Sequence, residues 1–145
     1  MILALDTDVL VSWAMQGTPR HRASRRLLER EVYEGDGQLG LTMQVLLEFV
    51  HVSTDPRRFA TPLPMEGALR LARGLWDGRE VVRLLPSPTV MHRTLELLDR
   101  LRLGRKRILD TALAATLEAA GVERLATFNG RDYAVFPFLK TVAPE

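Results

Sequence analysis

Short apolar runs alternate along the chain with longer stretches in which apolar residues recur at helical spacing. The short runs are bounded by turn residues and predict strands at residues 2–5, 39–41, 81–85, 124–127 and 139–142. The longer stretches predict helices at residues 9–13, 21–33, 43–52, 65–76, 89–103 and 108–120. Strands that alternate with helices predict an α/β fold, a three-layer α/β/α domain around a central, mostly parallel sheet.

Local signals support several of these boundaries. Thr42 is suited to cap the helix at 43–52, and Pro88 fits the first turn of the helix at 89–103. Gly121 is expected to end the helix before it. The proline-bearing stretch 55–64 is too short and too apolar for a domain linker, so we expect a single domain over residues 1–145.

The amino-acid composition limits the possible classes of protein and of chemistry. The 145 residues are 46% hydrophobic, which is enough for one compact core. No apolar run has the length of a membrane span, and the opening residues lack a basic leader, so no membrane association is expected. The absence of cysteine excludes disulfides, thiolate metal sites and thiol nucleophiles. We expect a cytoplasmic protein.

The positive charge is carried almost entirely by arginine, because Lys106 and Lys140 are the only lysines and the net charge is +2. The planar guanidinium suits phosphates and carboxylates, so RNA and an acidic protein are both plausible partners. Genomic base composition is an alternative explanation of the same bias.

Two groups of polar residues follow predicted strands. Asp6 comes directly after the first strand, and the turn 129–132, which ends in Asp132, follows the fourth. Ligands of open parallel sheets collect beyond the carboxyl ends of the strands. Each acid also has an ordinary explanation, since Asp6 could cap a helix and Asp132 could stabilise the turn.

Two further acids lie in helices that are otherwise apolar. Glu48 is the only acid of 43–52, and Asp110 is the only acid near the start of 108–120. A carboxylate in such surroundings is costly unless it is paired or bound to a cation. Alternatively, Glu48 lies on an exposed stripe with Gln44 and His51, and Asp110 is an N-cap. One magnesium site explains all four acids together, because Mg²⁺ takes hard oxygen ligands beside a substrate phosphate.

The order of the acidic motifs resembles that of PIN-domain ribonucleases, especially VapC-type toxins of toxin–antitoxin pairs. The motifs are Leu-Asp-Thr-Asp-Val-Leu-Val at 5–11, Leu-Leu-Glu-Phe at 46–49, Leu-Asp-Thr-Ala-Leu-Ala-Ala at 109–115 and Thr-Phe-Asn-Gly-Arg-Asp-Tyr at 127–133. The resemblance spans nearly the whole chain.

The resemblance implies a parallel sheet flanked by helices and a metal-dependent endoribonuclease. Its acidic quartet, which would be both catalytic and metal-binding, corresponds to Asp6, Glu48, Asp110 and Asp132. It further implies Mg²⁺ with Mn²⁺ as a substitute, a tRNA, rRNA or mRNA substrate, a cognate antitoxin and a homodimer.

Several residues are expected to support the quartet. Thr127 matches a small hydroxyl residue of the family and would hold Asp132 or a metal-bound water, and Asn129 could share the role of the fourth acid. Asp8 departs from the resemblance, because many relatives carry Asn or Ser there; it would strengthen metal binding or only cap a helix. The basic run Arg105, Lys106 and Arg107 could grip RNA phosphates or form a solvated helix start.

Two rival functions belong to other classes. The Asp-Thr-Asp opening also fits haloacid-dehalogenase-like phosphatases, in which Asp6 would be the nucleophile, but no late adjacent acidic pair is present. A non-catalytic module that binds RNA or protein is the second rival, and a full acidic set argues against it.

Overall fold

The computed structural model describes all 145 residues and contains one five-stranded sheet. The strands are β1 (Ile2–Leu5), β2 (Gln38–Thr42), β3 (Val81–Leu84), β4 (Arg124–Ala126) and β5 (Lys140–Val142). Their spatial order is β3-β2-β1-β4-β5, and every neighbouring pair is parallel. The predicted strands and the parallel sheet are confirmed. Because β1 is central, the chain builds one half of the sheet before the other.

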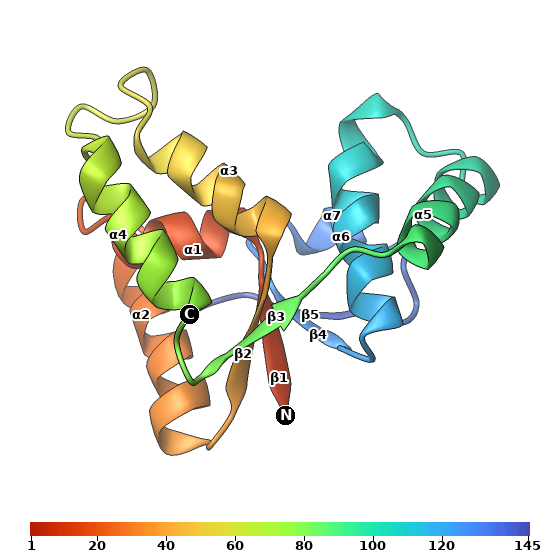
Figure 1. Cartoon of the computed structure of the whole chain (residues 1–145), viewed down its shortest axis with the longest axis horizontal. Helices are drawn as coiled ribbons and strands as arrows, with labels where there is room; N and C mark the ends of the chain where they lie inside the picture. Colours follow the sequence, from red (N-terminus) through yellow and green to blue (C-terminus); the bar gives the residue numbers. More distant parts are fainter.

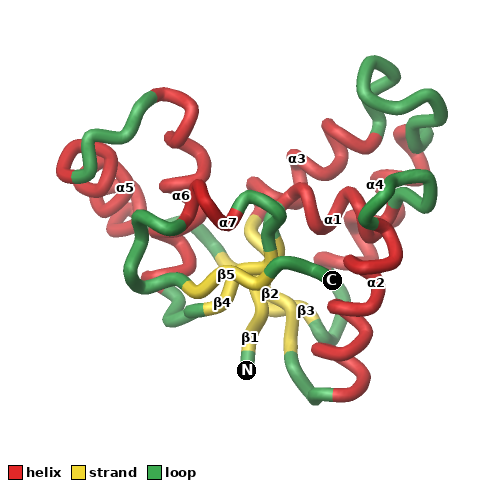
Figure 2. The backbone as a smooth tube through the Cα atoms, turned by 180° about the vertical axis from the view of Figure 1, so that it is seen from behind, coloured by secondary structure: helices red, strands yellow, loops and turns green.

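Helices cover both faces of the sheet. They are α1 (Thr7–Ala14), α2 (His21–Glu29), α3 (Met43–Ser53), α4 (Met65–Trp76), α5 (Pro88–Arg100), α6 (Ile108–Ala119) and α7 (Gly130–Tyr133). Helices α1 to α4 gather on one side of the sheet and α5 and α6 on the other, which gives the three predicted layers (Figures 1 and 2). No helix combines the length and the apolar character needed to cross a membrane.

The apolar runs form the core as expected. Leu3, Ala4 and Leu5 of β1 are at most 1% exposed, and they join a cluster of 28 buried residues from both faces of the sheet. Gly40 lies opposite Ala4 in the register, and a Cβ atom on Gly40 would meet side chains of Ile2 and Leu84 at 3.0 Å. Glycine therefore lets the neighbouring strands pack closely in the middle of the sheet.

Helix boundaries follow the predicted capping. The Thr42 hydroxyl accepts a hydrogen bond from the Val45 amide at 3.1 Å, and Pro88 lies in the first turn of α5 behind its Ser87 cap. Two predictions were wrong in detail. The helix predicted to reach residue 33 changes at Arg30–Glu34 into a wider π-helical turn, and the predicted turn at 129–132 contains the short helix α7.

Candidate metal-dependent active site

Asp6 lies where the two halves of the sheet meet. Its backbone amide donates to the Ala126 carbonyl at the end of β4, and its carboxylate accepts from the Thr7 amide at 2.9 Å, so Asp6 caps α1. The Thr127 hydroxyl donates to the other oxygen of the same carboxylate at 2.8 Å. Thr127 was expected to hold Asp132 or a metal-bound water, and in the structure it holds Asp6. Asp6 therefore caps helix α1 and also lies at the carboxyl ends of the strands, as both alternatives predicted.

Glu48 faces this junction from α3. Its carboxylate accepts from the Thr7 hydroxyl at 2.9 Å and from the Gln44 side chain at 3.1 Å, and it is half-buried. His51, which would share an exposed stripe with it, is exposed and joins none of these bonds. Thr7 thus links Asp6 and Glu48, with its amide on one and its hydroxyl on the other.

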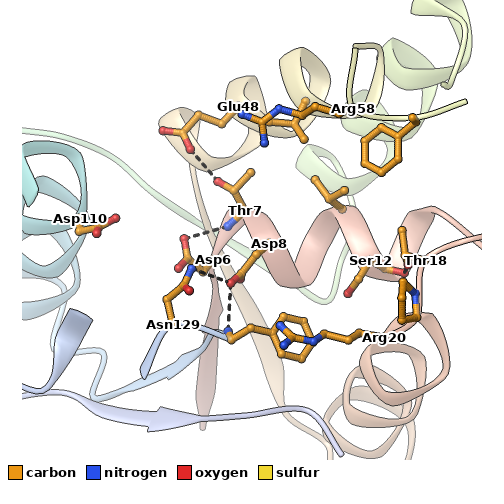
Figure 3. Close-up of a pocket in the computed structure, with 15 residues that line it drawn as sticks. Asp6, Thr7, Asp8, Ser12, Thr18, Arg20, Glu48, Arg58, Asp110 and Asn129 are labelled. Atoms are coloured by element: carbon orange, nitrogen blue, oxygen red, sulfur yellow. Dashed lines mark hydrogen bonds between the residues drawn. The ribbon is translucent and has the colours of Figure 1, made fainter. Parts of the chain in front are cut away.

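Asp110 completes a group of three acids. Helix α6 begins at Ile108 with Arg107 before it, so Asp110 lies inside the first turn and is not an N-cap. The buried Tyr133 hydroxyl lies 3.2 Å from Asp110 and 3.1 Å from Asp6, which puts both carboxylates within reach of one oxygen. Asp6, Glu48 and Asp110 line the same groove (Figure 3).

Burial and mutual repulsion raise the carboxyl pKa values in this groove. Burial is the main cause for Asp6, with the charge of Glu48 adding to it, and for Asp110, with the charge of Asp6 adding to it. Burial and the charge of Asp6 raise the pKa of Asp8 from 3.8 to about 6. Partly buried carboxylates that lie close to one another favour binding of a cation, which would stabilise their ionised form.

Asp8 contacts the segment that follows β4 and does not only cap a helix. One of its oxygens accepts from the Phe128 amide at 3.0 Å and from the Asn129 side chain at 3.1 Å. Its other oxygen is buried and has no hydrogen-bond partner. Asn129 therefore contacts Asp8, and the unpartnered carboxylate oxygen of Asp8 in the groove suits a cation ligand.

Asp132 is turned to a different partner. Arg107 forms an ion pair with the Asp132 carboxylate at 3.0 Å and donates to the Asp132 carbonyl at 2.8 Å. Asp132 does not line the groove of the other three acids, although its charge helps to raise the pKa of Asp110. Of the predicted quartet, Asp6, Glu48 and Asp110 line one groove, and Asp132 lies outside it.

The predicted basic run divides between two roles. Arg105 and Lys106 are exposed and line a second pocket that also contains Asp6, Glu48 and Asp110. Arg107 is occupied by Asp132. Two basic side chains are therefore free to meet a phosphate beside the acids.

The sequence of this chain shares a family with known proteins. The PIN domain family model matches residues 3–138. The chain belongs to the PIN-domain family. Among its relatives, Ribonuclease VapC33 of Mycobacterium tuberculosis is 30% identical over 141 residues, which cover 96% of this PIN domain and 95% of the relative. Ribonuclease VapC24 of the same organism is 27% identical over 143 residues, which cover 99% and 97%. The resemblance to VapC-type proteins is confirmed.

Solved structures share the fold of this PIN domain. The crystal structure of Mycobacterium tuberculosis VapC20, a toxin that cleaves the sarcin-ricin loop, matches with a TM-score of 0.73 at 18% identity and covers 92% of this chain and 95% of that one. VapBC2 from Rickettsia felis, bound to a DNA fragment from its promoter, matches with a TM-score of 0.66 at 17% identity over the full length of both chains. A toxin–antitoxin complex from Klebsiella pneumoniae matches with a TM-score of 0.67 at 19% identity, covering 99% and 98%.

The chemistry of the side chains in the groove of this PIN domain suits a divalent cation. No three of the acids converge closely enough in the structure to surround one ion. The acids nevertheless offer only hard carboxylate oxygens as ligands, and Asp6 and Asp110 both lie within hydrogen-bond distance of the Tyr133 hydroxyl. The sequence patterns had missed this hydroxyl, that of Tyr133, because its role depends on contacts with two distant segments.

Proposed function

We propose that this chain is a divalent-metal-dependent endoribonuclease, the toxin of a toxin–antitoxin pair, with residues 1–145 acting as one catalytic domain. The observation that carries the proposal is that Asp6, Glu48 and Asp110, from three separate segments, line one groove in a chain of the PIN-domain family. The family and the VapC relatives favour this function over the phosphatase and the non-catalytic binding module.

Asp6, Glu48 and Asp110 would hold the metal, which we propose to be Mg²⁺, with Mn²⁺ as a substitute. Such an ion supplies an activated water for in-line attack on a phosphodiester and stabilises the leaving oxygen. Thr7 and Thr127 fix the orientation of the Asp6 and Glu48 carboxylates by donating hydrogen bonds to them.

The remaining predicted residues have outer roles in this proposal. Asp132 acts as the fourth acid through its charge on Asp110 and its hold on Arg107. Asp8 adds negative charge to the groove beside Asp6, and the Asn129 amide orients the Asp8 carboxylate by donating a hydrogen bond to it. Arg105 and Lys106 contact the phosphates of a tRNA, rRNA or mRNA substrate, since charged groups next to a cleavage site position the backbone.

Protein partners are also part of the proposal. VapBC complexes stand among the similar solved structures, which supports a cognate antitoxin for this chain. Exposed apolar side chains on α3 and α4, Met43, Leu47 and Leu69, support a protein-binding surface there. A second group on α5, Met91 and Leu95, supports the homodimer. Light scattering of the chain with and without its antitoxin would measure both assemblies.

The direct test uses purified protein freed of partners. We expect cleavage of RNA that requires Mg²⁺ or Mn²⁺, stops with a chelator and returns with added metal. A phosphatase assay with a small phosphomonoester is expected to give no turnover. Turnover of the phosphomonoester through a phosphoaspartate at Asp6, without RNA cleavage, would reject the proposal.

Tyr133→Phe is expected to weaken the site without removing an acid. The variant keeps the buried ring but loses the hydroxyl that lies between Asp6 and Asp110. We expect the Mg²⁺ concentration for half-maximal cleavage to rise by about ten-fold, as for other groups that orient metal ligands. Tyr33→Phe is the matched control, because Tyr33 is 78% exposed. If both variants need the same Mg²⁺ concentration, the Tyr133 hydroxyl does not orient the metal ligands.

A further inference from the structure

The groove that holds the carboxylates continues beyond them along α1. The acids lie at one end, while Ser12 and Thr18 lie at the other (Figure 3). The groove has a volume of about 500 Å³, within the range of sites that enclose a small molecule. A metal ion and one phosphate would occupy only the acidic end. We call the remainder, lined by Val11, Ser12, Thr18, Val52, Phe59 and Phe128, the α1 arm.

Apolar and aromatic side chains line much of the α1 arm, whereas the other end of the groove is acidic. Phe59 comes from the loop between α3 and α4, and Phe128 follows β4, so two separate segments supply the rings. Both rings pack against the core and stay partly exposed. Partly exposed aromatic faces beside a phosphate-binding end are the surfaces on which unpaired bases stack.

Two arginines stand on opposite sides of the arm, Arg58 on one and Arg20 on the other (Figure 3). The Arg20 guanidinium lies 4.3 Å from the centre of the Phe128 ring and forms no ion pair. The only ion pair of Arg58 is with Asp55 at 3.7 Å, and the Arg58 side chain is 63% exposed. An exposed ion pair such as Arg58–Asp55 contributes little to stability, so the guanidinium groups of Arg20 and Arg58 can both bind phosphate.

We propose that the α1 arm binds the nucleotide next to the scissile phosphate of a single-stranded RNA segment. The base stacks on Phe59, and Arg20 and Arg58 bind the phosphates on either side of the arm. Stacking needs a base that is not paired in a helix, which favours a loop or an unpaired strand as substrate. The inference rests on the proposed function and adds to it the position and the kind of the neighbouring nucleotide.

The arm is suited to accept any base. The Thr18 hydroxyl already donates to the Met15 carbonyl at 2.8 Å, and the Ser12 hydroxyl is engaged with Ser24 and the Val9 carbonyl. Few donors are left to read a base edge, so stacking dominates and sequence preference at this nucleotide is expected to be weak.

The test compares two pairs of variants in steady-state cleavage of a short single-stranded RNA with Mg²⁺. Arg58→Ala has Arg57→Ala as its control, because Arg57 is exposed in the same loop and does not line the groove. Phe59→Leu removes the aromatic face, and Phe59→Tyr keeps it. We expect KM to rise about ten-fold for Arg58→Ala and Phe59→Leu, with kcat within about two-fold of wild type. Arg57→Ala is expected to keep the wild-type KM, and Phe59→Tyr is expected to recover most of the affinity that Phe59→Leu loses.

Salt dependence provides a second readout. Loss of one phosphate contact is expected to reduce the slope of log KM against log salt by about 0.7 for Arg58→Ala, with no change for Arg57→Ala. If the wild type cleaves RNA and both Arg58→Ala and Phe59→Leu keep its KM, the proposed role of the α1 arm is wrong, while the proposed function stands. Absence of RNA cleavage by the wild type would instead reject the proposed function, and the arm with it.

Discussion

Asp110→Asn is expected to reduce the rate of RNA cleavage by about 10³-fold or more, because a metal site that loses one of three carboxylates loses charge and a ligand. Asparagine keeps the size of the side chain and can still accept a hydrogen bond from Tyr133. Burial and the charge of Asp6 raise the pKa of Asp110, so neutralising it relieves repulsion in the metal-free protein. The loss of rate is therefore expected in a protein at least as stable as the wild type.

Cleavage rates and thermal unfolding of the same preparations check this result. Asp99→Asn is a suitable control, because Asp99 is exposed on α5 and forms no ion pair. Cleavage by Asp110→Asn within about three-fold of wild type would contradict the assignment of Asp110 to the metal site. An unfolded variant would be recognised by its lower melting temperature.

Metal-free protein is expected to lose stability as the pH rises from about 4 to about 6, and divalent metal is expected to restore it. The folded state raises the pKa of Asp6, Asp8 and Asp110, so in this window it binds more protons than the unfolded state. The free energy of unfolding therefore falls as these groups ionise. For Asp8, whose pKa rises from 3.8 to about 6, the loss has an upper limit of about 3 kcal/mol.

Denaturant unfolding across this pH range, with chelator and with Mg²⁺, measures both effects. Metal at a hundred times its dissociation constant is expected to add about 2.7 kcal/mol near neutral pH and much less at low pH, where protons compete for the carboxylates. Asp8→Asn should flatten the pH dependence of the metal-free protein, and Asp99→Asn should leave it unchanged. A metal-free protein whose stability rises through the window in parallel with Asp8→Asn would contradict the raised pKa values.

The fold could be predicted because each of its elements is encoded locally. The run Ile2–Leu5 is apolar and short, Thr42 caps α3, and Gly121 follows α6, so pattern and capping agree with the final packing. The π-helical turn at Arg30–Glu34 was missed, because it follows a regular helical pattern in the sequence. In the structure Glu31 of this turn pairs with Arg124 of β4 at 2.7 Å, a contact between segments 93 residues apart.

The candidate site was predictable in part for a related reason. Asp6, Glu48 and Asp110 attract attention because each is an acid in apolar surroundings or at a strand end, which is visible in the sequence. The orientation of a side chain is not visible there. Asp132 has the same sequence signal, yet Arg107 binds it outside the groove, and Tyr133 has no signal although its hydroxyl lies between two acids.

The central position of β1 has a consequence for the synthesis of this protein. Asp6 and Glu48 lie in the first third of the chain and are synthesised early, whereas Asp110 and the β4 strand that pairs with β1 are synthesised late. Until residue 127 has been synthesised, the nascent chain has only part of the proposed metal site, and its Asp6 lacks the Thr127 hydroxyl. We therefore expect a chain that ends before residue 127 to lack RNA cleavage, because its Asp6 carboxylate would not be held by the Thr127 hydroxyl.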